Sequence, residues 1–140
     1  MTEEAREIAL RRSFHQIEGA VVGADLDPLD EDGYTEVRHG QLLIGITVAH
    51  QHDLLMFVVR MGDLPRKPTP ELYRSLLEHN FVATGQASFA VDAKRQAICL
   101  RMIRRLEDLD YNGFEDMLQS IATVAADMRQ RIPMLSFIQR

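Results

Sequence analysis

Two histidines and an aspartate form the pattern closest to a metal-ligand set in this sequence. His50, His52 and Asp53 fall within one short polar stretch. Alternate residues of a strand share a face, so His50 and His52 could present two imidazoles together. A zinc site needs further protein ligands, and no third ligand is evident nearby. We therefore favour a polar turn. As an alternative we keep a metal-binding or small-ligand-binding regulator, or a minor enzyme, built on these three residues or on the arginines at 101, 104 and 105.

Other catalytic signatures are missing from the sequence. Cys99 lies between two apolar residues, as a buried cysteine normally does, and no local signature supplies the base that a nucleophile needs. The eight glycines are scattered and form neither a phosphate-binding loop nor a nucleophile elbow. The sequence therefore predicts a protein that is not an enzyme and that carries no cofactor and no metal.

Three arginines form the main basic group. Arg101, Arg104 and Arg105 lie close together near the end of an apolar stretch. They could contact an anion or an acidic partner. Pairing with the acidic residues within 107–110 is the simpler explanation, because neighbouring surface charges are often loosely paired.

Hydrophobic periodicity defines the elements that would position these residues. Helical spacing of apolar residues predicts helices, and strict alternation predicts strands. The predicted helices cover residues 4–21, 71–80 and about 110–132, and the predicted strands cover 34–39, 42–49, 54–61, 85–91 and 96–103. The resulting order, αβββαββα, lacks the repeated crossovers of a doubly wound sheet. We therefore predict an α+β fold with an antiparallel sheet of about five strands and helices packed on it.

The strand predicted at 42–49 has one face of large side chains and one of small side chains. The larger set is Leu42, Ile44, Ile46 and Val48, and the smaller set is Leu43, Gly45, Thr47 and Ala49. Small side chains allow close approach, so we expect a helix to pack against the smaller set.

Composition limits the class of protein. The chain has 140 residues, a formal net charge of −5 and a sequence pI of about 5.5. This acidic balance argues against binding to nucleic-acid phosphates. We expect one domain over 1–140, with an acidic loop at about 23–33 and an apolar tail at 133–140. The longest strongly apolar run, 54–59, is too short for a membrane span, and the first residues show no signal-peptide pattern, so we expect a cytoplasmic protein.

Four short motifs carry a resemblance to a known family. The segment 72–81, LYRSLLEHNF, resembles the "LYxxLLExN" helix of the YbjN family, which is similar in fold to the class I type III secretion chaperones of the CesT type. The segment 87–92, ASFAVD, is similar to the "xxFALD" strand of both groups. The segment 106–114 resembles the "LexLDynxF" start of the last helix, a motif more typical of YbjN-like proteins, and 63–65 resembles the "xLP" that closes the third strand. The resemblance covers about residues 34–132, and the element order agrees with it.

This resemblance implies a function without catalysis. Chaperones of this fold are small, acidic, cytoplasmic homodimers that hold an extended effector segment on apolar patches, and YbjN-like proteins are described as regulators. We therefore expect a chaperone-like or regulatory module that works as a homodimer and binds another protein or peptide segment. A dedicated class I type III secretion effector chaperone is the close alternative. Neither nucleic acid nor a membrane is expected as a partner.

Apolar residues that could mediate self-association occur in two places, the predicted helix at 71–80 and the tail. The candidate residues for this partner or dimer surface are Leu72, Leu76, Leu77, Met134, Leu135, Phe137 and Ile138.

Overall fold

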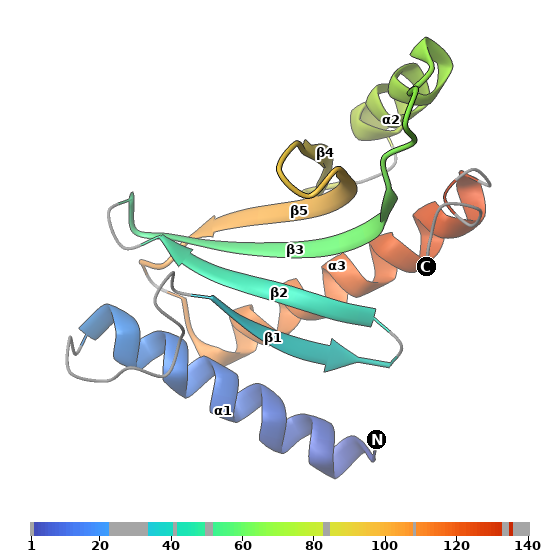
Figure 1. Cartoon of the computed structure of the whole chain (residues 1–140). Helices are drawn as coiled ribbons and strands as arrows, with labels where there is room; N and C mark the ends of the chain where they lie inside the picture. Colours follow the sequence, from blue (N-terminus) through green and yellow to red (C-terminus); the bar gives the residue numbers. More distant parts are fainter. Residues whose placement is uncertain are drawn as a thin grey trace.

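The computed structural model describes residues 2–22, 34–40, 42–49, 52–82, 85–107, 109–132 and 135 (Figure 1). Its elements are α1 (Glu3–Val22), β1 (Tyr34–His39), β2 (Leu42–Ala49), β3 (Leu54–Asp63), α2 (Pro70–Val82), β4 (Ser88–Asp92), β5 (Ala97–Arg105) and α3 (Tyr111–Arg131). The predicted order αβββαββα is confirmed. The acidic loop at about 23–33 lies outside the described residues, as do His50, Met134, Phe137 and Ile138.

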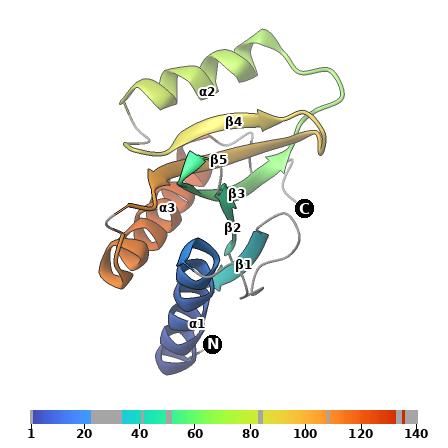
Figure 2. The ribbon, with the colours of Figure 1, turned by 90° about the vertical axis from the view of Figure 1, so that its left-hand side faces the viewer.

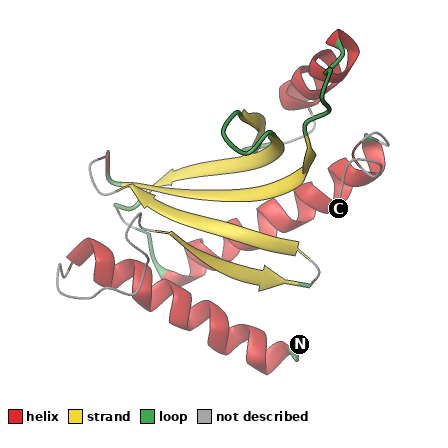
Figure 3. Ribbon diagram, in the orientation of Figure 1, coloured by secondary structure: helices red, strands yellow, loops and turns green. Residues whose placement is uncertain are grey.

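The five strands form one antiparallel sheet in the order β1-β2-β3-β5-β4 (Figure 3). Both predicted hairpins are present, and the longest strands, β3 and β5, pair at the centre. Their register shifts between Arg60 and Gly62. Arg129 of α3 donates a hydrogen bond to the Arg60 carbonyl at 3.3 Å. The predicted α+β class and sheet are therefore confirmed.

Helices α1 and α3 cover one face of the sheet (Figure 2). Alternate residues of β3, beginning with Leu55 and Phe57, are buried under them. Phe114 of α3 contacts the rings of both Phe57 and Phe14 of α1, with ring centroids 5.6 and 5.4 Å apart. Burial of these large apolar side chains is the main stabilising contribution to the core.

The predicted packing of β2 is wrong in its choice of face. The larger side chains Ile44, Ile46 and Val48 face the helices and are buried, whereas Leu43 on the opposite face remains 43% exposed. Helices bury more apolar area against large side chains than against small ones, which decides the orientation. The absence of a side chain at Gly45 instead leaves room for the ring of Tyr34 of β1. A Cβ added at Gly45 would lie only 2.7 Å from the Tyr34 hydroxyl oxygen, which is too close.

Local signals set the start of α3. The Asp110 carboxylate accepts a hydrogen bond from the Gly113 backbone N–H at 2.8 Å and so caps the helix. The predicted apolar stripe of this helix is buried, from Phe114 through Leu118 and Ile121 to Met128. None of the helices in the described part of the chain has the length and apolar character needed to cross a membrane.

Candidate partner-binding surfaces

Helix α2 lies beyond the β4 edge of the sheet, apart from α1 and α3 (Figure 2). It begins at Pro70, and the Thr69 hydroxyl oxygen accepts a hydrogen bond from the Leu72 backbone N–H at 3.2 Å. One face of the helix packs inward, because Leu72 and Leu76 are only 2% and 4% exposed. The helix therefore presents its opposite face outward.

A single asparagine ties α2 to the edge strand. The Asn80 side-chain oxygen accepts a hydrogen bond from the Phe89 N–H at 2.7 Å, and the side-chain nitrogen donates to the Phe89 carbonyl at 3.4 Å. The amide thus pairs with β4 much as a further strand would, at the edge where the sheet ends. The predicted end of the helix at Asn80 is wrong by two residues, because the helix continues to Val82.

The outward face of α2 carries an exposed apolar strip, which we define as Tyr73, Leu77 and Phe81. Their exposures are 38%, 67% and 89%. The three residues recur at intervals of four, so they lie on one helix face. They line an open hollow of about 910 Å³ together with Pro68, Pro70, Arg74 and Glu78. Arg74 and Glu78 form an ion pair at 3.6 Å beside the strip.

The predicted self-association residues differ in exposure, and only some of them lie at the surface. Leu77 belongs to the exposed strip, but Leu72 and Leu76 are buried within the chain and present no free surface. In the tail, Leu135 is 0% exposed and packs in the core, so it too presents no free surface. Tyr73 and Phe81 were missed, although their spacing of four from Leu77 is a visible signal. Sequence alone did not show which of the two apolar faces of this helix is buried.

The predicted arginine group is divided between two faces of β5. Arg101 and Arg105 share one face of the strand, and Arg104 lies on the other. The Arg104 guanidinium lies near the start of α3, 3.3 Å from where a Cβ added at Gly113 would stand. None of the ion pairs among the described residues includes these arginines. The simpler explanation, pairing with the acids that follow, is therefore not observed in that part of the chain.

The candidate metal pattern is only partly described. His52 is exposed, and Asp53 has a positive φ of 55°, as expected of a turn. The Asp53 carbonyl accepts a hydrogen bond from the Leu106 N–H at 2.9 Å, which continues the pairing of β3 with β5. Across the described ranges, no group of three or more His, Cys, Asp or Glu residues is placed to hold a metal ion. Cys99 is buried, and burial raises the pKa of its thiol, which disfavours the reactive thiolate.

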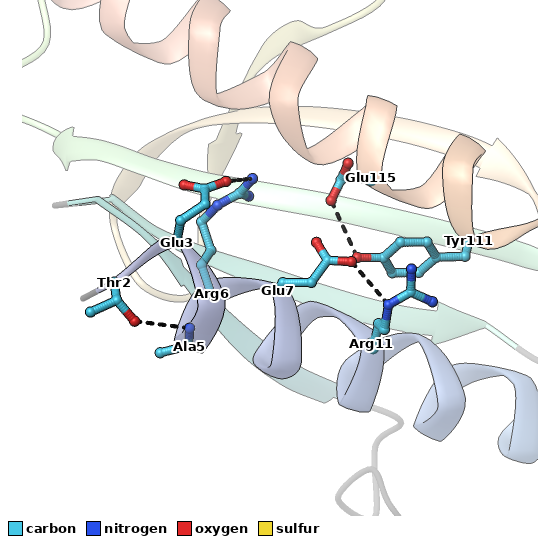
Figure 4. Close-up of polar contacts among 8 residues, drawn as sticks. All are labelled: Thr2, Glu3, Ala5, Arg6, Glu7, Arg11, Tyr111 and Glu115. Atoms are coloured by element: carbon cyan, nitrogen blue, oxygen red, sulfur yellow. Dashed lines mark hydrogen bonds and ion pairs between the residues drawn. The ribbon is translucent and has the colours of Figure 1, made fainter.

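A polar cluster joins α1 to α3 (Figure 4). The Tyr111 hydroxyl donates to Glu115 at 3.2 Å, and Arg11 donates to Glu7 at 2.9 Å while its guanidinium lies 4.1 Å from the Tyr111 ring centroid. Burial, followed by the hydrogen bond with Glu7, raises the pKa of Tyr111 to about 12. The same hydrogen bond is the largest cause that lowers the pKa of Glu7. These interactions hold α1 against α3.

Comparison with known proteins identifies the family. The model of the Tir chaperone protein (CesT) family matches residues 22–129, more than half of the chain. The chain therefore belongs to the Tir chaperone protein (CesT) family. Proteins of this family are non-enzymatic binding proteins, so the prediction that the protein is not an enzyme is confirmed. No curated protein matches the chain in sequence.

Several solved structures share the fold. A chain of the ExsC–ExsE complex is 16% identical with a TM-score of 0.61, and the match covers 94% of this chain and 95% of that one. A chain of the HopA1–SchA chaperone–effector complex is 12% identical with a TM-score of 0.59, covering 88% and 97%. A chain of the heterodimeric ExoU–SpcU complex, from the type III secretion system of Pseudomonas aeruginosa, is 17% identical with a TM-score of 0.57, covering 75% and 84%. The predicted resemblance to the CesT-type fold is thereby confirmed.

Proposed function

We propose that this protein is a chaperone of type III secretion that binds an effector protein and works in the cytoplasm as a homodimer. Membership in the CesT family supports the chaperone role, and the similar folds in chaperone–effector complexes support an effector as the partner. A YbjN-type regulator is the alternative within the same fold. A metal-binding or small-ligand-binding regulator has less support, because the described residues provide no metal cluster.

The observation that carries the homodimer is the exposed strip on α2. Tyr73, Leu77 and Phe81 expose large apolar side chains, which soluble proteins rarely leave together unless a partner covers them. The strip is also self-complementary. Arg74 and Glu78 stand beside it, so in a two-fold arrangement each arginine can meet the partner copy's glutamate across an apolar centre.

Size-exclusion chromatography with light scattering tests the homodimer. We expect a species of twice the 16.0 kDa chain mass for the parent protein. The double variant Leu77→Glu with Phe81→Glu places charges in the contact and should elute as a monomer. Ile8→Glu is the matched control, because Ile8 is 53% exposed on α1, and this variant should stay dimeric. A parent protein that is monomeric at tens of micromolar would contradict the proposal.

Co-purification from the native host tests the effector. We expect tagged chain to retain one protein in stoichiometric amount, and mass spectrometry should identify it as a secreted effector. Several weakly retained proteins, with none stoichiometric, would favour the YbjN-type regulator instead. The double variant of the α2 strip, assayed in parallel, shows whether effector binding needs the dimer.

A further inference from the structure

The sheet face opposite α1 and α3 carries no described helix and has an apolar centre (Figure 2). Leu54, Met56 and Val58 of β3 alternate with the buried residues and point to this open face, where they remain partly exposed. Leu43 of β2 and Ile103 of β5 lie beside them, 43% and 44% exposed. We call these five residues the outer apolar patch.

Arginines border the outer apolar patch on both sides. Arg101 pairs in register with Val58, and Arg105 pairs with Leu54, so both stand along β5 on this face. On the other side, Arg38 of β1 pairs with Leu43. All three side chains are exposed, and none takes part in an ion pair among the described residues. These three arginines outnumber Glu36, the carboxylate that β1 places on this face, although the whole chain has a formal net charge of −5.

Glu36 of β1 lies on the same face, because it pairs in register with Gly45, which in turn pairs with Val58. Glu36 of β1 accepts a hydrogen bond from the Tyr34 hydroxyl at 2.8 Å. Asp63 is paired with Arg60 at the end of β3. Since a neutral phenol leaves the charge of Glu36 in place beside Arg38, the excess positive charge of this face lies along β5, at Arg101 and Arg105.

We propose that the outer apolar patch binds an amphipathic, acidic helix of the partner protein. A sheet face with an apolar centre is stably covered by a helix that turns its apolar stripe inward, as α1 and α3 do on the opposite face. Such a helix, lying along β3, places the carboxylates of its β5 flank toward Arg101 and Arg105. Charge complementarity then favours an acidic helix over a basic one and speeds its association with the sheet.

The size of the face fits a short helix. A strand of ten residues such as β3 is about 34 Å long, and a helix of about 15 residues is about 22 Å long. A helix of that length therefore covers the patch without extending past the strand. A second copy of this chain is disfavoured as the occupant, because two basic faces would repel each other.

Fluorescence anisotropy with two synthetic peptides tests this proposal on the full-length protein. Both peptides are amphipathic helices of about 15 residues with the same leucine stripe, one flanked by glutamate and the other by lysine. We expect the glutamate peptide to bind, to bind more weakly as salt is raised, and to exceed the lysine peptide by about tenfold or more in affinity.

Paired variants locate the binding site. The double variant Arg101→Gln with Arg105→Gln should weaken binding of the glutamate peptide by about fivefold, as expected for two exposed charge pairs. Arg12→Gln with Arg66→Gln is the matched control, because it removes the same charge from exposed positions on α1 and on the segment between β3 and α2. Leu43→Ser with Ile103→Ser should also weaken binding, and Ile8→Ser should not.

Three outcomes would overturn the proposal. Equal affinity for the two peptides would show an apolar surface without charge selection. Equal loss in the control and the arginine variants would show an effect of net charge alone. Displacement of the peptide by inorganic phosphate or duplex DNA at comparable concentration would show a simple anion site.

This inference rests on the proposed function, since it names the kind of effector segment that is held. Its test needs neither a native effector nor the dimer. Failure of the peptide assay would therefore leave the chaperone proposal standing, and a monomeric parent protein would leave the peptide result interpretable.

Discussion

Asn80 shows how one side chain can fix the position of a whole helix. Its amide both accepts from and donates to the backbone of Phe89, so it occupies the edge of β4 as the backbone of a neighbouring strand would. An edge strand that is paired in this way is also less available for unwanted association. The asparagine in the segment LYRSLLEHNF is therefore explained by its bond to the strand and not by helix termination.

The first prediction concerns this asparagine. Asn80→Ala removes both hydrogen bonds to Phe89, and we expect the free energy of unfolding to fall by about 1–2 kcal/mol. Chemical denaturation measures it. The control is Asn112→Ala, an exposed asparagine in the first turn of α3, which should change stability by less than about 0.5 kcal/mol. Equal effects of the two substitutions would contradict the role assigned to Asn80.

At the scale of elements, α1 is attached to α3 through both apolar and polar contacts. The Phe14 ring packs edge-to-face against Tyr111, with centroids 5.8 Å apart, while the Tyr111 hydroxyl reaches Glu115 and Glu7 (Figure 4). The rings supply the buried area, and the carboxylates hold the hydroxyl at the solvent boundary. Because burial and then both carboxylates favour the protonated phenol, this helix contact should depend on pH.

The second prediction follows from the direction of these pKa changes. The pKa of Tyr111 is raised to about 12, above the ordinary tyrosine value of about 10. The unfolded chain therefore loses this proton first, and the stabilisation present below about pH 10 is lost as the pH approaches about 12. The pKa of Glu7 is lowered in the folded protein, so the ionised Glu7 contributes stability that is lost as the pH falls through the acidic range.

Tyr111→Phe tests this pH dependence. Relative to the parent protein, the variant should lose less stability between about pH 10 and 12, by about 1 kcal/mol after allowance for solvent screening. It should also lose less stability on acidification, because the largest cause of the Glu7 shift is removed. Urea denaturation at several pH values measures both effects. Tyr73→Phe serves as the control, and identical profiles for the two variants would refute the assignment.

At the scale of the whole molecule, the two exposed apolar surfaces lie on different elements, and we assign a different kind of binding to each. The α2 strip lies beyond the β4 edge, and the outer apolar patch lies on the sheet face that α1 and α3 leave open (Figures 1 and 2). The two surfaces share no residue, so we expect the proposed homodimer and the proposed acidic partner helix to be compatible in one assembly.

The third prediction concerns unfolding of the assembly. If the chain forms one domain and a homodimer, heating should give one cooperative transition whose midpoint depends on protein concentration. A hundredfold rise in concentration should raise the midpoint by about 4 °C. Scanning calorimetry measures this. Leu77→Glu with Phe81→Glu should abolish the dependence, and a parent protein without it would contradict the dimer.

Much of the fold followed from local pattern. The stripe from Phe114 to Met128 and the alternation in β3 and β5 predicted these elements because helical and strand periodicities are properties of neighbouring residues. The binding surfaces were less predictable. Arg101 and Arg104 are neighbours in sequence, yet β5 sends them to opposite faces. Tyr34 was not predicted to cover Gly45, because that contact joins two strands.

By itself, then, the sequence determined the order of helices and strands, the antiparallel α+β class and the absence of a recognisable catalytic motif. Each of these depends on residue types at short spacing. Only the tertiary structure decided which apolar faces are covered. Leu72 and Leu77 are the same residue type in the same helix, but one is 2% exposed and the other 67% exposed. The difference arises because burial depends on what the remainder of the chain brings against each face, and that is a long-range property.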